Sequence, residues 1–247
     1  MSKIVRYDLY RAFRQPGAYV LLAITALVAL ISAADVTFLS DEPCGGLLLT
    51  FGNALASGRS VLLMLAGCAC GLLIGEDLAS GSYGLCVGSG CGRWKILGGR
   101  TISCFAVISL MMAVYMLISA VFSAICAKTF AFSEFVRLIA LSLLHIAHFC
   151  MGNMLCILMC FVLKKRVSAT AVCLFMNVIL SSLLGTVCSK AEALGPLYLK
   201  SVPVITFTMF GGGEKALTVL ISTLLYLIAA AAVFFAAGRI FEKEELQ

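Results

Sequence analysis

Long runs of apolar residues limit most strongly what this chain can fold into. The run from Ile102 to Ala127 contains no charged residue and exceeds the roughly 20 residues that an α-helix needs to cross a bilayer. Of all residues, 62% are hydrophobic and only 12% are charged, whereas about a quarter of the residues in a soluble domain are charged. Too few polar side chains remain to cover a surface that faces water. We therefore expect an integral membrane protein.

The runs predict an all-α integral membrane fold with six transmembrane helices. A backbone in lipid must satisfy its own hydrogen bonds, and these runs are too long and unbroken for the alternating strands of a barrel. The second span is the shortest, and a start near Leu47 is the alternative. We expect residues 1–247 to form one transmembrane domain. The predicted spans are Gly17 to Ala34, Ser60 to Gly75, Ile102 to Ala127, Phe135 to Leu163, Ser168 to Cys188 and Ala216 to Gly238.

The distribution of Lys and Arg predicts that both termini lie in the cytoplasm. In that orientation twelve of the eighteen basic residues lie in inner segments and six, Arg59 among them, lie in outer segments. Cytoplasmic loops carry such an excess of positive charge. The net charge of +6 follows from this topology and does not point to nucleic acid. We expect a multi-pass protein of the cell membrane, from a bacterium; a signal peptide cleaved near ISAAD is a weaker alternative for the first span.

The first sixteen residues, MSKIVRYDLYRAFRQP, predict a helix that lies in the membrane interface. On a helical wheel one arc is basic, and the opposite arc holds Val5, Leu9, Ala12 and Phe13. Such a helix directs its cations to anionic headgroups and its apolar face to the acyl chains. Pro16 and Gly17 then predict a bend into the first span. An ordinary positive flank is the alternative. The basic arc consists of Lys3, Arg6, Arg11 and Arg14.

The segment 189–215 is too apolar for a solvated loop and too broken for another crossing. It contains Pro196 and Pro203 and ends in three successive glycines before Glu214. We predict a re-entrant pair of short helices in the outer leaflet between the fifth and sixth spans. A loop that follows the membrane surface is the alternative.

The segment 76–100, EDLASGSYGLCVGSGCGRWKILGGR, separates the second and third spans. It lacks the Gly-Lys-Ser/Thr sequence of a phosphate-binding loop and follows a membrane span rather than a strand, so we expect no nucleotide site in this chain. Basic residues at positions 93, 95 and 100 surround an apolar pair, and Glu76 and Asp77 stand at the end of the second span. We predict a short interfacial helix here, held by acid–base pairs across the loop, that a cytoplasmic partner contacts.

This pattern resembles the inner loop of the ABC-2 type permeases. Those permeases carry an acidic residue at the end of the second span, a Gly-Thr pair, a Ser-Arg or Pro-Arg step and a Lys that opens the third span. The amphipathic start, six spans and broken outer segment also resemble that family over nearly the whole chain. Ser82 stands in place of Thr and Arg100 in place of Lys, and the loop is unusually rich in glycine. The matching residues are Glu76, Gly81, Ser82, Arg93 and Arg100.

The resemblance implies that residues 76–100 form a cytoplasmic coupling loop. In that family the loop sits in a groove of a separate ATPase subunit, and ATP-driven closure of two such subunits pulls on it. Glu76, Arg93 and Lys95 would supply polar contacts, and the KKR turn at Lys164 a smaller one. ATP and Mg would be bound by the two ATPase subunits, with no cofactor in this chain. A second permease subunit, identical or related, is also implied. The alternative is that these bases only flank the spans.

No constellation of catalytic or metal-binding residues is visible in the spans. His145 and His148 share one helix face, but a third metal ligand is missing, so hydrogen bonds to neighbouring helices are the favoured interpretation. Most of the twelve cysteines lie in apolar runs as small hydrophobic residues, and Cys44 and Cys188 either form a disulfide or remain free thiols. The remaining polar residues line a pathway or join helices: Asn153, Asn177, Ser181 and Ser182.

The functional expectation is a permease subunit of an ATP-driven transporter that exports an amphipathic or hydrophobic substrate, such as an antimicrobial peptide. It is not expected to be an enzyme itself. An ATP-independent channel or scaffold is the alternative, and a membrane enzyme is a more distant one. The cargo, the direction of transport and the identity of the second subunit are left open by the sequence.

Overall fold

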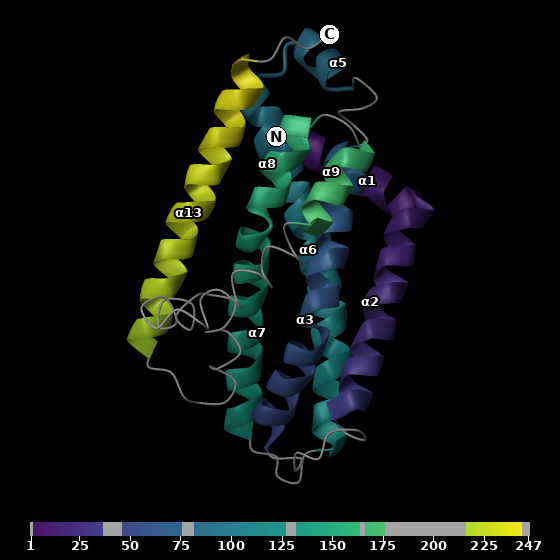
Figure 1. Cartoon of the computed structure of the whole chain (residues 1–247), viewed down its shortest axis with the longest axis vertical. Coiled ribbons are helices and arrows are strands. Elements are labelled where there is room, and N and C mark those ends of the chain that lie inside the picture. The colour runs from purple at the N-terminus through teal and green to yellow at the C-terminus, as the bar shows by residue number, and fades with distance from the viewer. Residues whose placement is uncertain are drawn as a thin grey trace.

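The computed structural model describes residues 2–36, 46–75, 82–126, 132–163, 166–175 and 216–243 (Figure 1). These residues form helices and contain no strand, which confirms the predicted all-α class. The predicted re-entrant segment 189–215 and most of the fifth span lie outside the described residues; of that span, α9 (Arg166–Phe175) is described up to Phe175.

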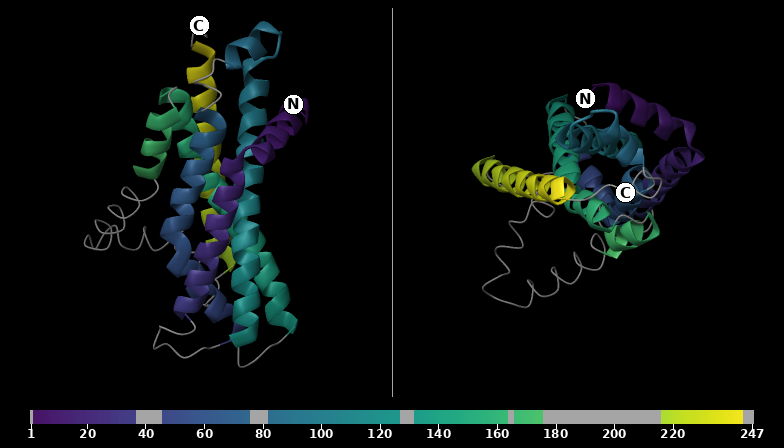
Figure 2. Two further views of the ribbon diagram at one scale, coloured as in Figure 1. Left: turned by 90° about the vertical axis from the view of Figure 1, so that its right-hand side faces the viewer. Right: turned by 90° about the horizontal axis from the view of Figure 1, so that it is seen from above.

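Two helices separated by a sharp break form the N-terminal part. α1 (Ser2–Arg14) is followed by Gln15, whose extended backbone (φ −83°, ψ 133°) interrupts the helix, and α2 (Pro16–Ala34) begins at Pro16. Proline is well placed at the first helical position, because its missing N–H has no partner there in any case. Seen from the side, α1 turns away from the axis of α2 (Figure 2). The predicted N-terminal helix and the break before Gly17 are therefore present.

The helix that follows is bent where a tyrosine meets its backbone. α3 (Leu47–Cys70) continues into the π-helical turn η2 (Gly71–Gly75). Its two parts, Leu47–Arg59 and Val61–Gly75, meet at 57°. The Tyr115 hydroxyl donates to the Ala54 carbonyl (2.6 Å) and lies where a side chain on Gly58 would be. A side chain that inserts into the helix ladder in this way is a common cause of a kink.

The second span thus starts near Leu47, the alternative considered from the sequence. The placement of Arg59 in an outer segment was wrong, because Arg59 lies within α3 and is partly buried. The physical reason is that Gly58 and Arg59 do not end the apolar pattern. Glycine is tolerated at this position because it makes room for Tyr115, and a single arginine does not break a helix.

Four helices in the described part of the chain are long and apolar enough to cross a membrane, or five if the bent pair in α3 and η2 counts as one span. These helices suggest a membrane protein. They correspond to the first, third, fourth and sixth predicted spans, and the bent pair corresponds to the second. The third runs through α6 (Arg93–Cys126) and the fourth through α7 (Phe132–Gly152) and α8 (Met154–Leu163). The last is α13 (Ala216–Lys243).

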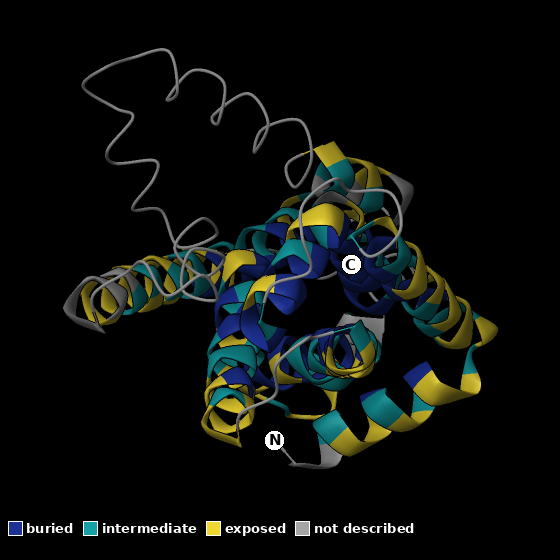
Figure 3. Ribbon diagram, turned by 90° about the horizontal axis from the view of Figure 1, so that it is seen from below, coloured by how far each residue is buried: buried dark blue, intermediate teal, exposed yellow. Residues whose placement is uncertain are grey.

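α6 lies at the centre of the bundle, packed against α1, α2 and α3. Its buried side chains, such as Leu97, Ile108 and Tyr115, join those of Phe51 and Phe161 in one core. Figure 3 shows this buried core surrounded by helices with exposed outer faces. The exposed faces are themselves apolar, as a lipid-facing surface requires.

Both described ends of the chain lie at the same end of the bundle, together with α5 (Ser82–Gly88) (Figure 1). We call this the upper end, as it appears in that view. Among the described residues, the Lys and Arg residues other than Arg59 and Arg137 belong to segments at the upper end. The upper end therefore carries the positive charge that the sequence assigned to the cytoplasmic side.

Candidate functional site at the upper end of the bundle

The described part of the 76–100 segment is a short helix, a tight turn and the start of α6. The turn contains Gly90 with φ +87°, a backbone conformation that residues other than glycine rarely adopt. The Gly90 amide donates a hydrogen bond to the Val87 carbonyl (2.9 Å). The Gly92 carbonyl then accepts from the Lys95 amide (2.9 Å), which opens α6. In the left-hand view of Figure 2, α5 lies beyond the upper end of α6.

A short helix is therefore present within the predicted segment. It comprises Ser82–Gly88, and Arg93–Arg100 instead forms the first two turns of the 34-residue helix α6. Gly98 and Gly99 do not end α6, because both are buried in packing contacts: a side chain on Gly99 would overlap Ile4 of α1. Tertiary packing thus compensates for the weak helix propensity of glycine.

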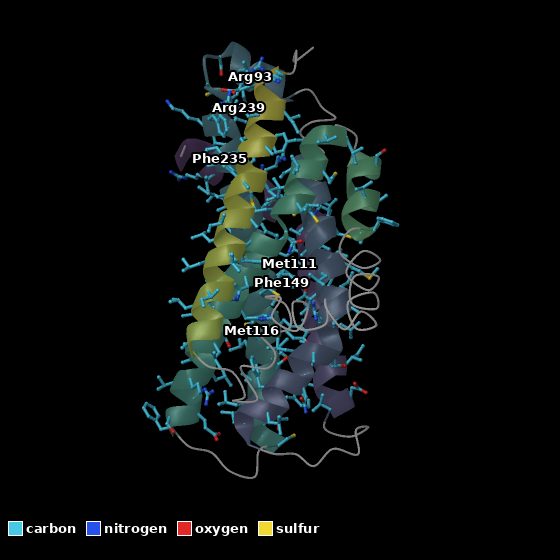
Figure 4. All side chains as sticks on the ribbon, turned by 60° about the vertical axis from the view of Figure 1, so that its left-hand side comes forward. Arg93, Met111, Met116, Phe149, Phe235 and Arg239 are labelled. Atoms are coloured by element: carbon cyan, nitrogen blue, oxygen red, sulfur yellow. The ribbon has the colours of Figure 1, made fainter. Side chains whose placement is uncertain are left out.

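Arg93 binds the end of α13. Its guanidinium donates to the carbonyl of Phe241 (3.0 Å) and to that of Glu242. These carbonyls belong to the last turn of a helix, which lacks intrahelical donors and attracts cations. Figure 4 shows Arg93 at the upper end of α6, beside the end of α13 that carries Arg239.

Trp94 adds an aromatic contact to the same junction. Its indole nitrogen donates to Glu242 Oε1 (2.6 Å), and its ring lies 6.0 Å from Phe234 and 5.9 Å from Phe235, measured between centroids. A Cβ on Gly238 would overlap the indole, so only glycine allows α13 to approach this closely. We call this contact the α6–α13 junction; it consists of Arg93 and Trp94 of α6 and of Gly238, Phe241 and Glu242 of α13.

Arg100 forms a buried ion pair with Asp8 of α1. Arg100 is 5% exposed and Asp8 is 2% exposed, and Ser103 Oγ lies 3.2 Å from the same carboxylate. Arg11 Nη2 also reaches the Leu73 carbonyl at 3.5 Å. Removing one member of a buried pair leaves an uncompensated charge, so loss of either side chain is expected to weaken the packing of α1 on α6. We call Asp8, Arg100 and Ser103 the α1–α6 junction.

The sequence did not single out Asp8, although a signal was present. On the helical wheel Asp8 lies between Ile4 and Ala12, on the apolar side of α1, where an unpaired carboxylate would be unfavourable. A basic partner elsewhere in the chain was therefore to be expected.

The predicted acid–base pairs within the segment 76–100 rely on Glu76 and Asp77, which lie outside the described residues.

The predicted site residues divide into contacts within the chain and exposed cations. Arg93 and Arg100 bind α13 and α1, whereas Lys95 is exposed within the first turn of α6. On α1, Arg6 and Arg14 are exposed and Arg11 is partly buried. The side chains of Lys3 and Ser82, and the residues Glu76 and Gly81, lie outside the described part.

Asn153 lies fully buried where α7 meets α8, and its amide donates to the Phe149 carbonyl of its own helix (2.9 Å). Its side chain therefore supports the helix junction. The other polar residues predicted near a pathway, Asn177, Ser181 and Ser182, lie outside the described residues.

A second polar group lies between α7 and α13. His148 Nε2 is 2.9 Å from the Thr223 hydroxyl, and the His148 ring packs edge-on against Tyr226. His148 thus makes the interhelical hydrogen bond that the sequence favoured.

Within the residues that the structure describes, no group of three or more His, Cys, Asp or Glu side chains is arranged to hold a metal ion. The described cysteines are free thiols, several of them buried in the core; Cys44 and Cys188, the predicted disulfide candidates, lie outside the described residues.

No protein-family model matches the sequence. No curated protein matches it either.

Proposed function

We propose that this chain is the membrane-spanning permease subunit of an ATP-driven transporter of the ABC-2 type, with the upper end in the cytoplasm. The proposal rests on the arrangement of the upper end: α5 is joined by a tight turn to α6, and α6 is fastened to both α1 and α13. Two ATPase subunits would bind there and supply ATP and Mg, and a second permease subunit, identical or related, would complete the pathway.

The mechanical part of the proposal follows from the two junctions. A push on α5 reaches α6 through the Gly88–Gly92 turn, and α6 is a continuous helix through to Cys126. The α1–α6 junction and the α6–α13 junction make the interfacial helix and the last helix follow α6. Closure of the ATPase subunits would then move three separate segments of the permease together.

The structure changes which basic residue is the best candidate for contact with an ATPase. Arg93 is engaged with carbonyls of α13, and Arg100 is buried against Asp8. Lys95 is exposed beside the turn that follows α5. We therefore assign the polar contact with the ATPase chiefly to Lys95.

For the cargo we propose an amphipathic or hydrophobic molecule, such as an antimicrobial peptide, that is exported. The group of His148, Thr223 and Tyr226 supplies polar contacts among otherwise apolar helices. A photoreactive residue in place of Tyr226 is expected to capture a labelled cationic peptide in an active complex. The same residue in place of the exposed Leu117 of α6 is the control. Equal labelling at Tyr226 and at the exposed Leu117 would count against a cargo pathway beside His148, Thr223 and Tyr226.

The coupling proposal is tested by co-purification and ATP hydrolysis. The chain is co-expressed with an ABC ATPase encoded beside it, and the complex is reconstituted with peptide cargo. Lys95→Glu is expected to abolish stimulation of ATP hydrolysis by cargo, while the complex still folds. Arg6→Glu, at an exposed position of α1, is the matched control.

Unchanged stimulation in the Lys95→Glu complex would refute the assigned contact. Failure of any ATPase to co-purify, together with ion flux through liposomes that contain this chain alone, would favour the alternative of an ATP-independent channel.

A further inference from the structure

An apolar cavity of about 210 Å³ lies behind the break between α1 and α2. Its wall combines residues of the break, of the first turns of α2, of the end of α3 with η2, and of α6. Gln15 supplies a polar side chain to the wall, and most of the other lining residues are apolar or small. They include Pro16, Ala18, Leu21, Ala69 and Val107.

The position of the cavity matches the boundary between headgroups and acyl chains. α1 carries the exposed bases of an interfacial helix, and α2 is long and apolar enough to cross the bilayer. From Gln15 to Leu21 the chain advances six residues, which corresponds to roughly 9 Å along a helix. The cavity therefore extends from the level of α1 into the apolar zone beside α2.

The cavity is chemically suited to a hydrocarbon chain. An apolar cavity of about 150 Å³ in a protein stays free of water and binds small apolar molecules. This one is larger and is bordered by helices that face lipid, so an acyl chain is the apolar group available to fill it. Its wall contains no charged side chain.

Among the residues that the structure describes, the charges beside the cavity, apart from that of the paired Asp8, are positive. Arg14 precedes the lining residue Gln15, is exposed, and lies over the Tyr10 ring at 5.2 Å. Arg11 binds the carbonyl of Leu73, another lining residue. The nearest acid on α1, Asp8, is paired with Arg100. An anionic headgroup is therefore favoured over a zwitterionic one at this position.

We propose that the cavity is a binding site for an anionic phospholipid, with one acyl chain against Ala18, Ala69 and Val107 and its headgroup phosphate against Arg14. The lipid supports the angle between α1 and α2, because it fills the space behind the break. This site does not depend on the proposed transport function, and its test requires no ATPase.

The test uses the purified full-length chain in nanodiscs that contain a trace of photoreactive lipid, with a diazirine near the start of the acyl chain. The probes are phosphatidylglycerol and phosphatidylcholine, and peptide mass spectrometry locates the labelled residues. We expect label on the cavity wall, with phosphatidylglycerol favoured about fivefold, the effect typical of one basic contact near an anionic surface.

Two variants and two matched controls separate the parts of the site. Ala18→Leu fills the cavity and is expected to remove labelling of the wall by both lipids, whereas Ala113→Leu, on an exposed face of α6, leaves it unchanged. Arg14→Gln is expected to abolish the preference for phosphatidylglycerol but keep labelling by phosphatidylcholine. Arg6→Gln, on the same helix, keeps the preference.

Equal labelling of the wall by the two lipids in the unaltered chain would overturn the headgroup assignment. Wall labelling that persists in Ala18→Leu, or a peptide found in the cavity instead of lipid, would overturn the site itself. If Ala18→Leu fails to fold, the two arginine variants still test the site. Arg14→Gln must then lose the preference for phosphatidylglycerol, and Arg6→Gln must keep it.

Discussion

The two junctions of α6 hold distant parts of the chain together by different physical means. On one side the α1–α6 junction buries an ion pair, Asp8 with Arg100, almost completely. On the other side, at the α6–α13 junction, Arg93 donates hydrogen bonds to carbonyls at the end of α13, and the Trp94 ring packs against Gly238. Glu242 at this junction is exposed. The first is sensitive to loss of a single charge, whereas the second depends on shape. One helix is therefore held to α1 mainly by charge and to α13 mainly by close packing.

The largest expected effect is the loss of the buried carboxylate. Asp8→Ala leaves Arg100 charged and buried, and we expect the free energy of unfolding to fall by about 3–5 kcal/mol. The measurement is SDS titration of the purified protein in detergent. The double variant Asp8→Leu with Arg100→Met is expected to recover most of the loss, because neither charge then remains. A loss below that of an exposed change such as Arg6→Ala would show that the pair does not hold α1.

The next effect tests the shape of the α6–α13 junction. Gly238→Ala places a methyl group against the Trp94 indole, and we expect a loss of about 1–3 kcal/mol, as in other overpacked sites. Gly88→Ala is the matched control, since nothing lies within 4 Å of its added Cβ. Trp94 fluorescence in the same titration reports whether the indole has moved. Equal stabilities of the two variants would mean that α13 does not pack on Trp94.

A smaller effect is expected at the polar part of that junction. Arg93→Gln removes the cation from the last carbonyls of α13, and the partly exposed hydrogen bonds should contribute about 1 kcal/mol. Amide hydrogen exchange is expected to rise in residues 239–243 and to stay unchanged in α2. Faster exchange throughout the bundle would show that Arg93 supports more than the end of α13.

The smallest effect on stability is expected at Lys95. Lys95 is exposed next to both junctions, so Lys95→Gln should change the free energy of unfolding by less than about 0.5 kcal/mol. In the reconstituted transport complex the same variant is expected to weaken the stimulation of ATP hydrolysis by cargo. A clear loss of stability in the Lys95→Gln protein alone would place this residue in the fold rather than in the contact with an ATPase.

Residues with a local signal could be predicted, and residues with a distant partner could not. The break before α2 follows from Pro16 and Gly17, and the helix α1 follows from the two-sided pattern of its bases and apolar residues. Asp8 carried a signal, an acid on an apolar face, but its partner Arg100 lies 92 positions away. A short helix was expected within residues 76–100 and lies at Ser82–Gly88. The start of α6 at Arg93 was not predicted, because Gly98 and Gly99 look like helix breakers until Ile4 packs against Gly99.

By itself, the sequence determined the all-helical class and the approximate limits of most of the apolar helices that the structure describes. These properties follow from the length and hydrophobicity of single segments, which each satisfy their own backbone in lipid. Only the tertiary structure decided that Arg93 and Arg100 are bound within the chain, that Lys95 is exposed, and that a cavity lies behind Gln15. The reason is that a side chain's availability depends on which distant helix packs beside it, and no local pattern records that neighbour.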